Sequence, residues 1–233
     1  MKKLLVLLAV LFAGTFAAQA TNMGDDFHNH YNPATSNLSA YNRDLNSMVG
    51  TVDFHTGKGA TFPAFNVGAN VSVFKPSSKN DISSDSYTVL PFISAQTRIP
   101  VVGVGLVARG TDFNGFSSIG GGLTYQMDVI EVVHLSFGAF YDHGRTDWYA
   151  QDHYSASAIA SMGILFFTPY VGVGYDYGKL ETRGYAYNRS TSDSAVRGMV
   201  GLDIHPFPLL SGFVGYTVSK DSHGFTVGLG LSF

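Results

Sequence analysis

The chain has 233 residues, of which 45% are hydrophobic and only 13% charged, and its formal net charge at pH 7 is −3. The lack of cysteine excludes a disulfide scaffold, a thiolate metal site and a thiol nucleophile. The slight acidity argues against a nucleic-acid-binding protein, and the 14% of aromatic residues excludes an acidic disordered chain.

The first twenty residues have the features of a secretory signal peptide. Lys2 and Lys3 precede an unbroken apolar run from Leu4 to Phe12, and Ala18-Gln19-Ala20 supplies a small-x-small cleavage site. This run is too short to cross a bilayer, and no later stretch has the roughly 18 apolar residues that a transmembrane helix needs. We predict export and removal of residues 1–20.

Residues 21–60 are polar and irregular, and three interpretations stay open. Leu38 to Met48 suits a short helix, whereas Met48, Gly50 and Val52 alternate as a strand would. The segment is then a periplasmic arm, a plug inside the body of the protein, or an additional strand pair. Its acidic and histidine residues lack a further fixed ligand, so we predict no metal site and no cofactor.

From residue 61 onward, large apolar side chains alternate with small or polar ones. This period of two is that of β-strands, whose successive side chains point to opposite faces. We predict ten strands, near residues 62–75, 86–98, 101–110, 116–127, 132–142, 154–167, 170–178, 193–204, 211–219 and 223–233.

The polar face of these strands distinguishes two all-β folds. A soluble sandwich has charged outer faces, but here the polar face is mostly Gly, Ser, Thr and Asn. A transmembrane barrel has an apolar outer face and a polar or small inner face, and it must close because lipid cannot satisfy open edges. We predict a closed antiparallel transmembrane β-barrel over residues 61–233, with ten strands or twelve.

The connections between these strands alternate in length. The odd-numbered connections are mostly longer and polar and the even-numbered ones are short, as extracellular loops alternate with periplasmic turns. The odd-numbered connections are 76–85, 111–115, 143–153, 179–192 and 220–222. This places both ends of the barrel in the periplasm. Exposed aromatic and guanidinium groups make good anchors for a partner, so the candidate surface-loop contacts are Arg145, Trp148, Tyr149, Tyr185 and Tyr187.

The last strand resembles the C-terminal signature strand of Gram-negative outer-membrane β-barrels. It ends in Phe233, and the residues that carry the pattern are Phe225, Val227, Leu229, Leu231 and Phe233. The resemblance implies insertion by the barrel-assembly machinery and residence among the lipids of the cell outer membrane. Asn32-Pro33-Ala34 is similar to a segment of the long-chain fatty-acid transporters, which implies a channel for hydrophobic solutes.

Two short patterns suggest catalysis. His134-Leu135-Ser136 resembles the His-x-Ser pair of the outer-membrane phospholipase and the lipid A deacylase, which implies a serine nucleophile with a histidine base. Asp203-Ile204-His205 resembles the Asp–His pair of the omptin proteases. The alternation turns His134 and Ser136 toward the lumen. Asp203 and His205 lie at a predicted periplasmic turn. A membrane-embedded hydrolase is therefore only the minor alternative.

Glycines at six positions of the inner face leave space in a narrow lumen: Gly120, Gly122, Gly172, Gly174, Gly228 and Gly230. About eight strands enclose an interior that side chains just fill, so ten leave some room. We expect a non-enzymatic barrel that passes small solutes passively. The alternative is a closed structural or surface-interaction barrel that binds a partner through its loops.

Overall fold

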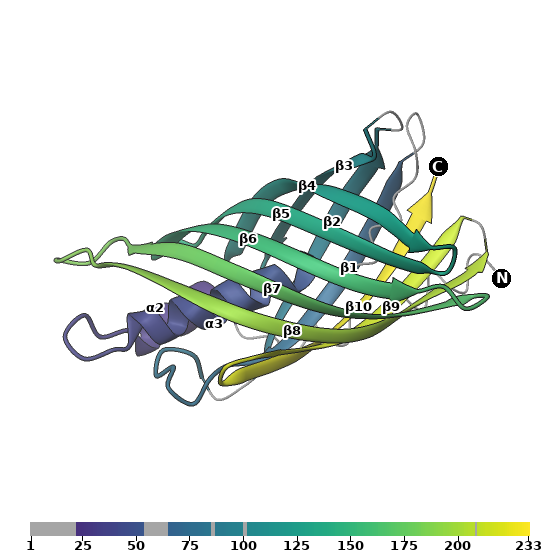
Figure 1. The fold of residues 1–233 in the computed structure, drawn as a ribbon. Helices are drawn as coiled ribbons and strands as arrows, with labels where there is room; N and C mark the ends of the chain where they lie inside the picture. The colour runs from purple at the N-terminus through teal and green to yellow at the C-terminus, as the bar shows by residue number, and fades with distance from the viewer. Residues whose placement is uncertain (1–21, 54–64, 85–86, 100–101, 208) are drawn as a thin grey trace.

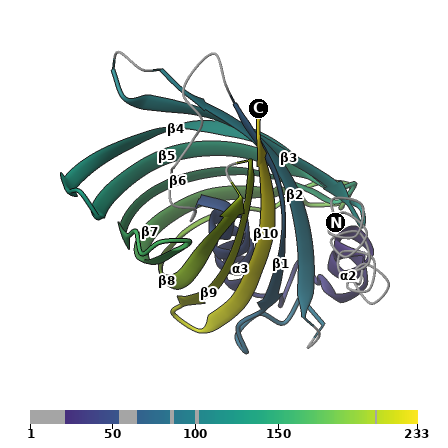
Figure 2. The same cartoon turned by 90° about the vertical axis from the view of Figure 1, so that its right-hand side faces the viewer.

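The computed structural model describes residues 22–53, 65–84, 87–99, 102–207 and 209–233. Ten antiparallel strands follow one another around a closed barrel, in which β1 pairs with both β2 and β10 (Figures 1 and 2). This confirms the predicted fold. The strands are Asn66–Lys75 (β1), Thr88–Arg98 (β2), Val104–Phe113 (β3), Phe116–Ile130 (β4), Val133–Arg145 (β5), Tyr149–Met162 (β6), Phe167–Thr182 (β7), Ser190–Phe207 (β8), Leu210–Ser219 (β9) and Ser222–Ser232 (β10).

The outer face of the barrel carries an apolar belt between two rows of aromatic residues. Tyr141, Tyr154 and Tyr177 are direct cross-strand neighbours on β5, β6 and β7, and all three are exposed. On β7, Tyr177 lies ten positions after Phe167, which belongs to the other row. At about 3.3 Å per residue and a tilt of about 40°, the rows lie about 25 Å apart, which is the height of a lipid-facing belt.

The C-terminal pattern lies on this outer face. The side chains of Phe225, Leu229, Leu231 and Phe233 are exposed. Phe233 follows the end of β10, where its amide donates to the carbonyl of Phe65 at 2.9 Å and its carbonyl accepts from the amide of Phe65 at 3.2 Å. These bonds continue the β1–β10 ladder to the end of the chain, so the barrel closes at the signature strand.

The wall is higher on one side than on the other. β4 to β8 have 13 to 18 residues, whereas β1 to β3, β9 and β10 have 10 or 11. The β7–β8 hairpin projects farthest, at the end where the helices lie (Figure 1). The predicted loop 143–153 is therefore mostly strand, and half of the predicted loop 179–192 is strand. Above the membrane a strand needs no apolar face, so its sequence looks like that of a loop although its ladder bonds continue.

Among the described residues before the barrel are two helices and a 3-10 turn: α2 (Met23–His30), α3 (Leu38–Gly50) and η1 (Thr51–Asp53). The side chain of Asn22 caps α2 by accepting from the amides of Gly24 and Asp25 at 2.9 and 3.0 Å. Asn37 caps α3 in the same way through the amide of Ala40 at 3.1 Å. These caps start helices where an additional strand pair was one of the three expectations, and that expectation is wrong.

We name residues 22–53 the plug segment, because α3 lies inside the ring of strands (Figure 2). Its side chains bond to β1, β6, β7 and β9, which surround it. The predicted boundaries near residues 20 and 60, like the signal peptide, fall on 1–21 and 54–64, outside the described residues. Within the part of the chain that the structure describes, no helix is long and apolar enough to cross a membrane.

The space at four of the six predicted inner glycines, Gly120, Gly122, Gly228 and Gly230, is filled. A Cβ on Gly122 would meet the ring of Phe140 at 2.4 Å, and one on Gly228 would meet the ring of Phe213 at 2.2 Å. A Cβ on Gly178 would lie 1.9 Å from the amide oxygen of Asn46 in α3. Glycine at these positions lets large side chains of the neighbouring strand, or the plug segment itself, approach the backbone.

Candidate functional site

The lumen is occupied by α3, which has one polar and one apolar face. On the polar face, Asn42 donates to the carbonyl of Gly178 at 2.8 Å, and Gln151 on β6 donates to Asn46 at 2.6 Å. Farther along, Ser47 donates to Ser219 on β9 at 3.1 Å. The apolar face joins a buried cluster with the wall that includes Tyr41, Leu45, Met48, Phe74, Leu90 and Phe92.

Six buried ionisable side chains form a closed ring at the C-terminal end of α3. We name this ring the lumen ring. The members in order are Asp53, Arg109, Asp142, His153, Asp176 and Arg197. Asp53 is the member from the plug segment, and the other five come from β3, β5, β6, β7 and β8. Arg197 also donates to the carbonyl of Gly50 at the end of α3. The ring therefore ties the inner end of the plug segment to half of the wall.

Charge-assisted hydrogen bonds hold the lumen ring together. Asp53 accepts from Arg109 and from Arg197 at 2.5 Å each. The six side chains are between 0 and 1% exposed. Buried charges persist only when they are paired and hydrogen-bonded, and here every guanidinium bridges two carboxylates.

His153 completes the charge balance of the ring. Its Nδ1 lies 3.2 Å from Asp142 and its Nε2 lies 3.0 Å from Asp176. A carboxylate only accepts, so both contacts are hydrogen bonds only when both ring nitrogens carry a proton. The imidazolium with two arginines then balances three aspartates, and the ring is neutral.

The other end of the plug segment closes the mouth of the barrel. The amide of Met23 donates to the carbonyl of Asn114 in the β3–β4 turn at 2.9 Å. The ring of His28 stacks on that of Trp148 in the β5–β6 turn, with centroids 3.7 Å apart. Arg189, in the β7–β8 connection, donates to the carbonyl of Pro33 at 2.7 Å. The described N-terminal residues thus lie at the end of the barrel opposite Phe233.

The predicted surface contacts divide into two groups. Tyr149 is fully buried and accepts a hydrogen bond from Tyr41 at 2.9 Å, so the expectation that it is exposed is wrong. Trp148 and Tyr185 are partly buried against the plug segment. Arg145 and Tyr187 stay exposed, and Tyr187 is 82% accessible. Aromatic residues on a hairpin bind inward here because α2 offers them an apolar partner.

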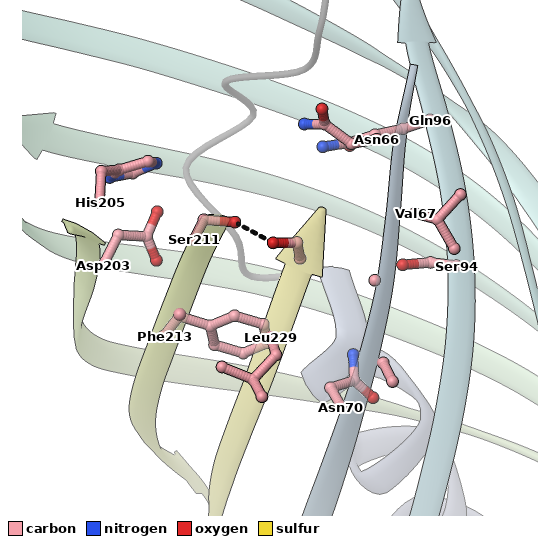
Figure 3. Close-up of a pocket in the computed structure, with 14 residues that line it drawn as sticks. Asn66, Val67, Asn70, Ser94, Gln96, Asp203, His205, Ser211, Phe213 and Leu229 are labelled. Atoms are coloured by element: carbon pink, nitrogen blue, oxygen red, sulfur yellow. Dashed lines mark hydrogen bonds between the residues drawn. The ribbon is translucent and has the colours of Figure 1, made fainter. Parts of the chain in front are cut away.

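A hollow of about 70 Å³ with both polar and apolar lining residues opens at the other end of the lumen (Figure 3). Its lining includes Asn66, Gln96, Asp203, His205 and Ser211. Asp203 and His205, the pair that resembles the omptins, therefore belong to the inner wall near this end, far from the loops of the opposite mouth.

The His-x-Ser pair also faces inward. His134 is half-buried and its Nδ1 lies 2.5 Å from the carboxylate of Asp128 on β4, while Ser136 is buried. In α2, Asp26 contacts His30 at 3.1 Å. Among the described residues, no three His, Asp or Glu side chains gather as metal ligands would.

No protein-family model matches the chain, and no curated protein matches it in sequence. By fold it is similar to the N-terminal β-barrel domain of Pseudomonas aeruginosa OprF, at 13% identity and a TM-score of 0.38 over 71% of this chain and 97% of that one. It is similar to the KdgM porin at 12% identity and a TM-score of 0.43, over 72% of this chain and 99% of that one. It is also similar to Neisserial surface protein A, at 15% identity and a TM-score of 0.39 over 73% of this chain and 99% of that one.

The barrel itself decides the class. A closed antiparallel sheet with a lipid-facing belt about 25 Å tall between two aromatic rows is the architecture of bacterial outer-membrane proteins. The chain is an outer-membrane β-barrel protein. None of the structures named above is a fatty-acid transporter, and Asn32-Pro33-Ala34 forms the turn between α2 and α3 of this outer-membrane barrel.

Proposed function

We propose that this outer-membrane barrel is a gated, non-enzymatic channel for small polar solutes, and that the plug segment is its gate. The observation that carries the proposal is the lumen ring, which anchors the inner end of the plug segment by charge pairs beside the apolar face of α3. Charge pairs and hydrogen bonds exchange with water at little net cost, so such an interface suits a segment that leaves its site.

The orientation follows from the connections. The mouth that α2 covers carries the two longest connections between strands, 76–87 and 183–189, whereas the connections at the other end have five residues or fewer. Longer loops face the outside in bacterial barrels. The gate then closes the channel from the external side, and the hollow near Asp203 faces the periplasm.

The wall favours polar solutes over the hydrophobic ones that the fatty-acid transporter resemblance implies. Its buried inward side chains include serines and threonines on several strands, among them Ser72, Ser118, Ser157, Thr217 and Thr226. Once the plug segment leaves, water and hydrophilic solutes find hydrogen-bond partners along this path.

A reversible crosslink tests whether the plug segment is the gate. The chain has no native cysteine, and the hydroxyls of Ser47 on α3 and Ser219 on β9 lie 3.1 Å apart. The variant Ser47→Cys/Ser219→Cys therefore locks the gate when oxidised. Thr111→Cys/Ser118→Cys is the matched control, because these residues are cross-strand neighbours on β3 and β4, both lie in the wall, and neither hydroxyl bonds to the described plug segment.

In planar bilayers, the Ser47/Ser219 variant is expected to open when reduced and to fall silent when oxidised. The control is expected to conduct in both states. Conductance that persists after complete crosslinking of Ser47 to Ser219 would show that α3 is not the gate. If the uncrosslinked protein never opens, even with Asp53 neutralised, the channel proposal fails.

That last result would favour the second candidate, a closed surface-interaction barrel. Its support is the mouth closed by α2 together with the exposed tip of the β7–β8 hairpin, where Tyr187 stands in solvent. The candidate contacts left accessible for a partner are then Arg145 and Tyr187, and a loop-dependent binding assay on whole cells with both residues replaced by alanine tests it.

A further inference from the structure

A polar pocket of about 560 Å³ lies outside the lumen, where three turns of the loop end meet. Its lining includes Asp112, Ser117, Arg145, Asp147 and Arg183. The amide of Arg183 donates to the carbonyl of Trp148 at 2.6 Å, which ties the β7–β8 hairpin to the β5–β6 turn. The pocket is therefore held by backbone bonds between neighbouring hairpins.

Two arginines in this pocket are not used by the fold. Within the described residues, neither Arg145 nor Arg183 has a carboxylate within 4 Å, and Arg145 donates only to the hydroxyl of Ser117 at 3.3 Å. Both side chains are exposed. By contrast, Arg109 and Arg197 are fully paired in the lumen ring. Two guanidinium groups that share one hollow favour an oxyanion with several acceptor oxygens.

The pocket continues toward the lipid. A second hollow of about 350 Å³ shares Ser117 and Arg145 with the first and also includes Ile119 and His143. Ile119 is 73% exposed on the lipid-facing surface. A ligand that fills both hollows has an anionic head and an apolar body.

The height above the membrane suits a lipid headgroup. Arg145 stands four residues beyond Tyr141 of the aromatic row on β5, which is about 13 Å along the strand and about 10 Å along the membrane normal. The headgroup layer is roughly 5–8 Å thick on each side. A long arginine side chain spans the remaining distance by bending back toward the membrane.

We propose that Arg145 and Arg183 bind a phosphate group of a phosphorylated glycolipid in the outer leaflet. Each guanidinium donates two parallel hydrogen bonds to phosphate oxygens. Asp112 and Asp147 border the same pocket, and their carboxylates can share a hydrated divalent cation with the phosphates, since such cations prefer oxygen ligands. The inference rests on the proposed orientation but not on gating.

Native mass spectrometry of the full mature chain in detergent, with magnesium present, tests the site. The probes are diphosphorylated lipid A and the same lipid after enzymatic removal of its phosphates. We expect the protein to retain the diphosphorylated lipid. Arg145→Gln and Arg183→Gln should each weaken its binding about 10-fold or more, because each removes a charge-assisted contact. Lys220→Gln, which removes an exposed positive charge in the β9–β10 turn at the same end of the barrel, is the control and should bind normally.

Three results would overturn the proposal. One is equal retention of the dephosphorylated lipid, and another is unchanged binding in both Arg→Gln variants. The third is displacement of the lipid by an equimolar amount of inorganic phosphate, which would identify a site for the free anion. Heat-dependent gel mobility shows whether each variant still forms the barrel. Because no conductance enters the assay, failure here and failure of the channel proposal are separate results.

Discussion

Asp53 of the plug segment and Arg197 of β8 form an ion pair of 2.5 Å, with both side chains fully buried. Since Asp53 also pairs with Arg109, one carboxylate joins the plug segment to opposite arcs of the lumen ring. The other ring carboxylates belong to the wall and stay there when the plug segment leaves. Asp53 is thus the residue whose loss separates gate from wall with the least change elsewhere.

Replacing Asp53 by asparagine should weaken docking of the plug segment by about 3 kcal/mol, because it leaves an uncompensated positive charge in the ring. That corresponds to a shift of about 100-fold in the docking equilibrium, and it should appear as more frequent openings in planar bilayers. Asp25→Asn, at an exposed position of α2, is the control. Equal opening frequencies in both variants would contradict this role of the ring.

The charge balance of the ring predicts a compensation between two residues. His153→Gln removes one positive charge and should destabilise the docked state by about 2–4 kcal/mol. Adding Asp142→Asn restores neutrality, so the double variant should be destabilised by less than the sum of the single changes. Urea unfolding followed by Trp148 fluorescence measures the three values. Strict additivity would show that His153 does not act as the third cation.

Asp44 on α3 predicts a pH dependence of docking. Burial raises the pKa of its carboxyl above the ordinary 3.8, although it accepts bonds from the side chain of Asn80 and the amide of Ser77. The docked state then holds this proton more tightly than the undocked state. The resulting stabilisation is complete below pH 3.8 and is lost as pH rises through the raised pKa.

Docking followed by Trp148 fluorescence should therefore weaken as the pH rises above about 4. In Asp44→Asn, this part of the pH dependence should disappear and docking at neutral pH should strengthen. The argument fails if the variant and the original chain show the same pH profile.

Phe27 anchors the cap over the mouth. It is fully buried, and its ring lies 4.8 Å from Tyr31, 5.1 Å from Tyr41 and 4.8 Å from Tyr149, measured between centroids. Phe27→Ala should cost about 3–5 kcal/mol of cap stability. Limited proteolysis should then cleave within residues 22–37, while Asn29→Ala, at an exposed position, should leave the cap resistant. Equal resistance of both variants would contradict the role of Phe27.

Much of the fold follows from local pattern. Alternation of apolar and small residues is sufficient to predict ten strands, because lipid on one side and a narrow lumen on the other impose opposite demands on successive residues. The strand ends were harder to place. Between Asp142 and Asp152 both faces of the hairpin meet water or protein, so the apolar period ends while the strand pairing continues.

The site itself shows the limit of such reasoning. Docking of the plug segment depends on hydrogen bonds of the polar residues Asn42, Asn46 and Asp53. In the sequence, such residues are typical of an exposed arm. The lumen ring could have been suspected from Arg109 and Arg197, since each is an isolated charge at an inward position of a strand. Their partners lie 21 to 144 residues away in the chain, beyond the reach of any local pattern.

The amino-acid sequence by itself therefore determined the barrel, its membrane face and its C-terminal strand, because each depends on the environment of one residue at a time. Only the tertiary structure decided that the lumen is occupied, that Tyr149 turns inward, and that six charges close into a ring. These depend on which distant side chains meet once the sheet has closed, and ion pairing inside a barrel is set by that closure.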